Sequence, residues 1–103
     1  MKNLDSDNLQ EVVQQHDKLF VQYGAEWCGA CKIMKPQVTD IEGNYEGIEF
    51  IYVDAEKNPQ SRQLATVDNL PTFAVFEKGE FKKQVQASLL PPVKRLLDEI
   101  ASN

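Results

Sequence analysis

Residues that build metal centres and disulfide scaffolds are scarce in this sequence. Its 103 residues include two cysteines and one histidine, too few for a disulfide-rich scaffold or a zinc site built from histidines. No apolar run approaches the roughly 18 residues of a membrane-spanning helix. Basic residues number 11 against 16 acidic ones, which gives a net charge of -5. Because an acidic chain without a basic stripe repels nucleic acid, we exclude nucleic-acid binding as well as membrane insertion.

The composition that remains is typical of one folded domain. Hydrophobic residues make up 42% and charged residues 26% of the chain, and a chain of this length supports a single hydrophobic core. We therefore predict one domain over residues 1–103, working as a monomer. The first ten residues, MKNLDSDNLQ, contain no apolar stretch and no cleavage signature, which predicts a cytoplasmic protein without a secretory signal.

The spacing of apolar residues predicts helices that alternate with strands. Helices are predicted over about residues 6–16, with Asp5 and Ser6 as candidate N-caps, from Cys28 to Gly43-Asn44, from Pro59, and from Pro91. The apolar positions are Ile33, Met34, Val38 and Ile41 in the second helix, and a core-facing stripe of Val93, Leu96, Leu97 and Ile100 in the last. Strands are predicted over residues 19–23, 48–53, 72–77 and 81–85. Strands separated by helices pair in parallel, whereas the short turn at Lys78-Gly79 makes the last two an antiparallel hairpin. The fold class is therefore α/β, with a central mixed sheet of four to five strands and helices on both faces.

Both cysteines stand in the segment Trp27-Cys28-Gly29-Ala30-Cys31. The segment follows a predicted strand and opens a predicted helix, where backbone N–H groups lack partners and the helix dipole places partial positive charge. A thiolate at Cys28 gains from both, so we expect the pKa of this thiol to lie below that of a free cysteine. Cys31, one turn further on, is expected to be buried. An exposed attacking sulfur and a sheltered resolving sulfur are what thiol–disulfide exchange requires.

Two other uses of the cysteine pair stay open on these residues alone. A static structural disulfide is opposed by the reducing conditions of the cytoplasm. A zinc site needs two further ligands, and His16 is the only other soft one, so two chains would have to share two such pairs. His16 itself stands near a predicted helix end and is interpreted as a capping or surface residue.

The segment Asn69-Leu70-Pro71-Thr72 directly precedes a predicted strand. Because cis bonds are a small minority of X–Pro bonds in folded proteins, elementary chemistry predicts a trans bond before Pro71. On this interpretation the proline only marks the entry to the strand.

Taken together, these motifs resemble the thioredoxin family. The resemblance rests on Ala25-Glu26-Trp27-Cys28-Gly29-Ala30-Cys31-Lys32, Pro36, Leu70-Pro71-Thr72 and Lys78-Gly79, and extends from about Leu4 to Ile100. It implies the thioredoxin fold and the reduction of protein disulfides, with Cys28 as nucleophile and Cys31 as resolving thiol. It implies no bound cofactor beyond a redox-active Cys28–Cys31 disulfide, and an NADPH-dependent thioredoxin reductase as electron donor.

The resemblance also implies a substrate-binding surface. Pro71 is expected to be cis and to pack opposite the cysteines, leaving nearby backbone groups free to pair with an extended substrate strand. Trp27 is expected to flank the cysteines as an apolar contact surface, with a packing role in the core or at the surface as the alternative. The other substrate-binding residues implied are Gly29, Ala30, Leu70 and Ala87.

Four positions depart from the family pattern. Gln22 stands where thioredoxins usually have a buried aspartate that takes the proton of the resolving thiol, and Tyr52 stands where they have a lysine nearby. Because an amide cannot ionise, we expect slower resolution of the mixed disulfide. Ala87 replaces a common glycine, and Gly24 replaces a large aromatic residue found in many members.

A fifth departure lies between the cysteines, where Ala30 replaces the usual proline. Alanine restores a backbone N–H near the Cys28 sulfur, which is expected to stabilise the thiolate and make the couple more oxidising. The departures leave two alternatives to a general reductase: a narrow-client thioredoxin-like isomerase and a redox-switched binding module.

Overall fold

Short strands and helices alternate along the chain in the computed structural model, which describes residues 1–102. The strands are β1 (Lys2–Asn3), β2 (Lys18–Gly24), β3 (Glu49–Asp54), β4 (Thr72–Glu77) and β5 (Glu80–Gln86). The helices are α1 (Leu9–Gln15), α2 (Gly29–Ile41), α3 (Pro59–Arg62) and α4 (Leu90–Ala101), with a 3₁₀ turn η1 (Glu42–Asn44) after α2. Within residues 1–102, none of these helices has the length and apolar content needed to cross a bilayer.

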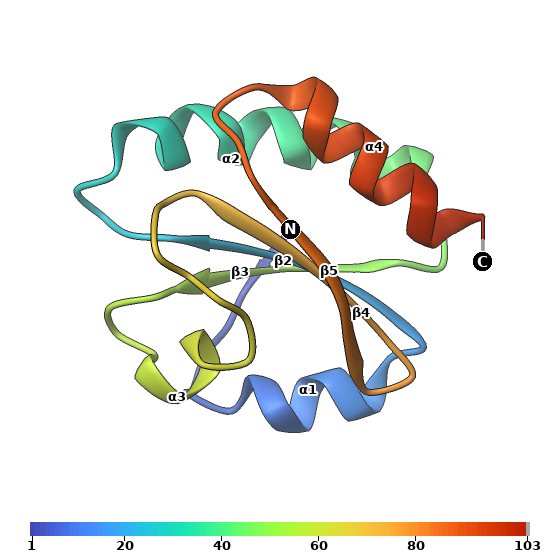
Figure 1. Cartoon of the computed structure of the whole chain (residues 1–103), viewed down its shortest axis with the longest axis horizontal. Helices are drawn as coiled ribbons and strands as arrows, with labels where there is room; N and C mark the ends of the chain where they lie inside the picture. Colours follow the sequence, from blue (N-terminus) through green and yellow to red (C-terminus); the bar gives the residue numbers. More distant parts are fainter. Residues whose placement is uncertain (103) are drawn as a thin grey trace.

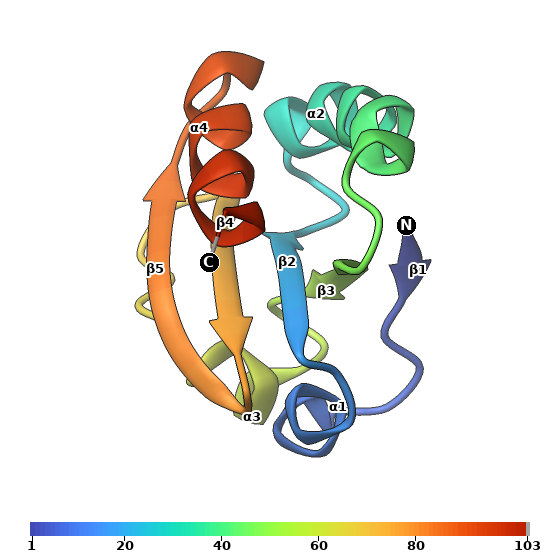
Figure 2. The same ribbon diagram turned by 90° about the vertical axis from the view of Figure 1, so that its right-hand side faces the viewer.

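The five strands form one mixed sheet in the order β1-β3-β2-β4-β5 (Figure 2). β2 pairs in parallel with β3, which aligns Gln22 with Tyr52, and antiparallel with β4, which aligns Gln22 with Phe73. β4 and β5 form the predicted antiparallel hairpin. The predicted mixed sheet is thus confirmed, and Gln22 lies in its central strand.

Helices cover both faces of the sheet, with α2 and α4 on one face and α1 and α3 on the other (Figure 1). Successive side chains of a strand point to opposite faces of the sheet, so β2 contributes to the hydrophobic core on each face. Phe20 packs beneath α2 and α4, while Val21 and Tyr23 pack toward α1 and α3. In α4 the predicted apolar stripe is confirmed, since its members are all buried: Val93, Leu96, Leu97 and Ile100.

The structure corrects the predicted elements in three places. The edge strand β1 was not predicted, because its two residues are exposed and carry no strand pattern. Helix α1 begins at Leu9 after Asn8, and not at Asp5 or Ser6. Ile33, predicted to face the core, is 62% exposed, because the neighbouring Met34 and Val38 occupy the buried face of α2.

A fully buried serine connects α1 to α3. Ser61 Oγ accepts a hydrogen bond from the Leu9 N–H at 3.0 Å, and the Ser61 carbonyl accepts one from the Tyr23 hydroxyl at 2.9 Å. The Asp7 carboxylate accepts bonds from the N–H groups of Gln60 at 3.0 Å and Ser61 at 2.7 Å. Burial alone would raise the pKa of Asp7, but these hydrogen bonds hold it below its usual value.

Replacing Ser61 with alanine is expected to destabilise the protein by about 1–3 kcal/mol, because the buried Leu9 N–H would lose its acceptor. Urea denaturation of both proteins measures the change. The matched control is Ser88→Ala, at an exposed position before α4, where the effect should stay within about 0.5 kcal/mol. Equal stabilities of the two variants would contradict the role assigned to Ser61.

Candidate functional site

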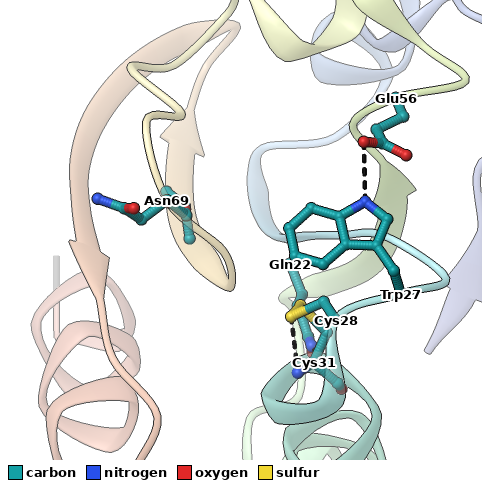
Figure 3. Close-up of a disulfide and its surroundings, with 7 residues drawn as sticks. Gln22, Trp27, Cys28, Cys31, Glu56 and Asn69 are labelled. Carbon is teal, nitrogen blue, oxygen red and sulfur yellow. Dashed lines mark hydrogen bonds between the residues drawn. A yellow bond between two sulfur atoms is a disulfide. The ribbon is translucent and has the colours of Figure 1, made fainter.

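The two cysteines form a disulfide at the start of α2. Cys28 is the N-cap residue of the helix, with extended backbone (φ -83°, ψ 103°), and its sulfur accepts a hydrogen bond from the Cys31 N–H at 3.1 Å (Figure 3). An N-cap side chain ordinarily accepts a hydrogen bond from the second or third helical N–H. In α2 the acceptor is the Cys28 sulfur. The C-x-x-C spacing therefore places the Cys31 N–H within hydrogen-bond distance of the Cys28 sulfur. The Cα atoms of the two cysteines are 5.3 Å apart.

The two sulfurs differ less in exposure than predicted. Cys31 is fully buried, as expected, but Cys28 is only 4% exposed. The prediction of an exposed attacking sulfur is therefore wrong for the disulfide form, because the S–S bond holds Cys28 against its buried partner. Ala25 completes this small cluster, and Ala30 and Leu70 pack against it.

A loop from a distant part of the sequence closes the site. The Leu70–Pro71 peptide bond is cis, as the family resemblance implied and against the expectation from elementary chemistry. Thr72 Oγ1 donates a hydrogen bond to the Asn69 carbonyl at 2.6 Å, which stabilises this turn. Figure 3 shows the loop, marked by Asn69, across from Trp27 and the cysteines. The structure thus brings Leu70 and the two cysteines together.

The other predicted substrate-binding residues differ in burial and in position. Trp27 is 68% exposed, which excludes the alternative of a core residue, and its Nε1–H donates to Glu56 Oε2 at 2.8 Å (Figure 3). Gly29 is exposed and Ala30 is half-buried. Ala87 follows β5 and packs, half-buried, against the core beneath α4. Glu56 was not predicted, since only the tertiary fold brings its carboxylate to the indole.

Gln22 lies at the buried side of the cysteine pair. Its side chain is fully buried, and Nε2 donates a hydrogen bond to the Cys31 carbonyl at 3.3 Å. Its Oε1 is the only buried side-chain nitrogen or oxygen without a hydrogen-bond partner in residues 1–102. A buried carbonyl in that condition costs about 1–3 kcal/mol. The predicted proximity of Gln22 to the resolving cysteine is therefore confirmed.

Comparison with known proteins gives the fold and the site a family. The family model described as thioredoxin matches residues 1–101. The chain belongs to the thioredoxin family. It is 34% identical over 77 residues to thioredoxin 1 of a Nostoc species, covering 74% of this chain and 72% of that protein. It is 35% identical over 74 residues to a thioredoxin of Staphylococcus haemolyticus, covering 71% and 70%.

Solved thioredoxin structures share the same fold. A thioredoxin of Plasmodium falciparum superposes with a TM-score of 0.89 at 24% identity, covering 96% of this chain and 98% of that one. Mitochondrial thioredoxin 3 of Saccharomyces cerevisiae, in its oxidised form, superposes with a TM-score of 0.87 at 23% identity, covering 96% and 94%. The predicted thioredoxin fold is confirmed. A thioredoxin-family chain with a C-x-x-C disulfide is a thiol–disulfide oxidoreductase.

Two departures from the thioredoxin pattern are coupled in space. A Cβ atom added to Gly24 would lie 2.7 Å from Tyr52 Cζ, so the Tyr52 ring fills the space that a larger residue at position 24 would need. Lys35 Nζ lies 4.1 Å from the centroid of that ring, in a cation–π contact. Burial, together with the charge of Asp54, raises the pKa of Tyr52.

Charged residues gather beside the cysteine pair of this thioredoxin site. Glu26 pairs with Lys57 at 2.6 Å, and the hydrogen bond to Glu26 raises the pKa of Lys57. Both line a cavity of about 620 Å³ that also includes Lys35 and Tyr52. Neither cysteine lines this cavity, but Ala25 of the cysteine cluster does, so the cavity adjoins the redox centre.

The zinc alternative requires ligands from two chains. In the part that the structure describes, residues 1–102, no three side chains of the metal-binding types gather at one place. His16 is the C-terminal cap residue of α1, as predicted, with Nδ1 4.0 Å from a Glu49 oxygen.

In the reduced protein, iodoacetamide is expected to label Cys28 on the order of 10-fold faster than Cys31 near pH 7. The helix start stabilises a thiolate at Cys28, whereas Cys31 stays buried. Mass spectrometry of the labelled peptides against time measures both rates. Protein unfolded in urea serves as the control, where both thiols should react alike. Equal labelling in the folded protein would contradict the asymmetry.

Proposed function

We propose that the protein reduces disulfide bonds in other proteins, with Cys28 as the attacking and Cys31 as the resolving residue. One observation supports this most directly: the Cys28 sulfur caps α2 and is joined to a fully buried Cys31 sulfur. The helix start stabilises an anion at Cys28 and not at Cys31. Attack and resolution therefore fall to different sulfurs.

The proposed reaction passes two electrons in two displacements. The Cys28 thiolate attacks one sulfur of the substrate disulfide, a mixed disulfide forms, and the other substrate sulfur leaves as a thiolate that takes a proton from solvent. Cys31 then loses its proton and attacks the Cys28 sulfur. The Cys28–Cys31 disulfide forms, and the second substrate sulfur leaves as a thiolate that takes a proton from solvent. Because Gln22 cannot ionise, the Cys31 proton goes to water, Glu26 or a base in solution, and we still predict slower resolution.

The substrate segment is proposed to lie between Trp27 and the loop at Leu70–Pro71. The exposed indole offers an apolar surface, and an extended peptide next to Pro71 can pair with free backbone groups of the loop. Gly29 and Ala30 would contact the substrate from the helix start, and Ala87 from the segment after β5. The hydrogen bond from Trp27 Nε1–H to Glu56 orients the indole at this surface.

The remaining parts of the cycle follow from its chemistry. The disulfide formed in each turnover needs a dithiol donor, for which we propose an NADPH-dependent thioredoxin reductase. One chain supplies both sulfurs, so a monomer without a further bound cofactor is sufficient. We propose a cytoplasmic location, because that compartment keeps such a donor reduced.

Insulin reduction is expected for the wild type, with dithiothreitol as donor and also with NADPH and a thioredoxin reductase. Both Cys28→Ser and Cys31→Ser should lose turnover with either donor, because each variant lacks one of the two sulfurs. Cys31→Ser should also accumulate a mixed disulfide with insulin, visible on a non-reducing gel. Turbidity of the precipitating insulin chains measures the rate.

The outcomes of that assay separate the candidate functions. Turnover with dithiothreitol but not with the reductase would contradict only the proposed donor. A wild type without turnover would contradict the reductase function and favour a redox-switched binding module. Turnover confined to one client among several disulfide proteins would favour the narrow-client alternative.

Changing Ala30 to proline is expected to make the couple more reducing. The Ala30 N–H is one of the free donors at the start of α2, and a Cys28 thiolate can accept a hydrogen bond from it. Proline removes that donor and is tolerated in the first turn of a helix. Equilibration with glutathione should shift toward the disulfide by roughly 2–10-fold. Ala30→Ser keeps the N–H and should match the wild type. A shift in the opposite direction would contradict the role of this donor.

A further inference from the structure

The Gln22 side chain has one end bonded and one end unsatisfied in the disulfide form. Its Nε2 donates to the Cys31 carbonyl at 3.3 Å, while Oε1 is buried and lacks any donor within residues 1–102. Swapping the two ends of the amide would point an oxygen at the Cys31 carbonyl, so the hydrogen bond fixes the orientation. In the disulfide form, therefore, no protein group within residues 1–102 donates to Oε1.

The sheet around Gln22 has no spare donor for this oxygen. Gln22 lies in the central strand between Tyr52 of β3 and Phe73 of β4, where backbone N–H groups are engaged in strand pairing. The Tyr52 side chain lies over Gly24, two residues further along β2. A phenylalanine ring offers no donor. A new donor must therefore come from the helix side, where the two cysteines lie (Figure 3).

Reduction creates such a donor. Two electrons and two protons convert the Cys28–Cys31 disulfide into two thiols, with a dithiol or two glutathione molecules as reductant. Cys31 then carries an S–H in a fully buried position, on the residue whose carbonyl Gln22 already holds. A thiol is a weak donor, but its hydrogen bond to a buried carbonyl is favoured when that carbonyl has no other partner.

We propose that Gln22 is a positioning residue that tunes the redox couple: its Oε1 accepts a hydrogen bond from the Cys31 thiol in the reduced protein and has no partner in the oxidised one. The amide thereby stabilises the dithiol form relative to the disulfide form. It also holds the Cys31 proton in place, which leaves the negative charge on Cys28. The inference rests on the proposed dithiol cycle at these two cysteines.

The test replaces Gln22 with methionine, which has a similar length but no amide. Loss of the Nε2 hydrogen bond destabilises both redox forms alike and so does not change the redox equilibrium. Loss of Oε1 destabilises only the dithiol form and therefore shifts that equilibrium. In glutathione buffers the variant is expected to shift toward the disulfide by about 5–10-fold, which corresponds to a potential lower by about 20–30 mV. Gln84→Met, at a glutamine that bonds Thr66 away from the cysteines, should leave the equilibrium unchanged.

Thermal or urea unfolding of both redox forms gives a second readout. Gln22→Met should destabilise the dithiol form more than the disulfide form, because only the dithiol form loses a hydrogen bond to Oε1. A purely structural role for Gln22, or a water that serves Oε1 in both forms, would change the two forms equally and leave the potential unmoved. Either result overturns the proposal.

A measurement on the wild type keeps the proposal testable if the variant fails to fold. The side-chain carbonyl ¹³C signal of Gln22 should shift on reduction in the direction of hydrogen bonding, while that of Gln84 stays constant. In Cys31→Ala, which has no thiol there, the Gln22 signal should remain at its disulfide-form position. An unchanged Gln22 signal overturns the inference, yet insulin reduction by the same protein would leave the proposed function standing.

Discussion

The hydrogen bond from the Cys31 N–H to the Cys28 sulfur is the contact on which the site depends. It makes a cysteine the N-cap of α2 and thereby fixes where the helix begins after β2. The partial positive charge of the helix start then falls on one sulfur and not on the other. The three-residue spacing makes this cap possible, and the same arrangement places the buried Cys31 within reach of Cys28 for the disulfide.

Beneath that contact, the central strand carries an unusual set of side chains for a thioredoxin. A neutral amide at Gln22 takes the place of an ionisable group, and the neighbouring Tyr52 ring lies over Gly24 with Lys35 on its face. A buried charge without a partner is costly, so a neutral residue at position 22 agrees with a neutral residue at position 52. An amide at position 22 cannot take up a proton but can form hydrogen bonds.

Much of the fold was predictable because its signals are local. Val93 and Leu97 of α4 follow helical spacing, and both are buried as expected. The misses have equally physical causes: β1 is stabilised by pairing with β3 and not by its own residues, and Ile33 lies on the exposed side of α2 although it fits an apolar pattern. At the site, the cis bond before Pro71 was predictable only from the family resemblance.

The sequence by itself determined the redox pair. In a C-x-x-C segment between a strand and a helix, the three-residue offset alone places both cysteines within the first turn of the helix. Only the tertiary structure decided what surrounds that pair. Leu70 reaches the cysteines from the loop before β4, Glu56 bonds Trp27, and the Gln22 amide lies against Cys31. These contacts join residues from separate strands and loops, and their distances depend on how the whole sheet packs, which no local spacing encodes.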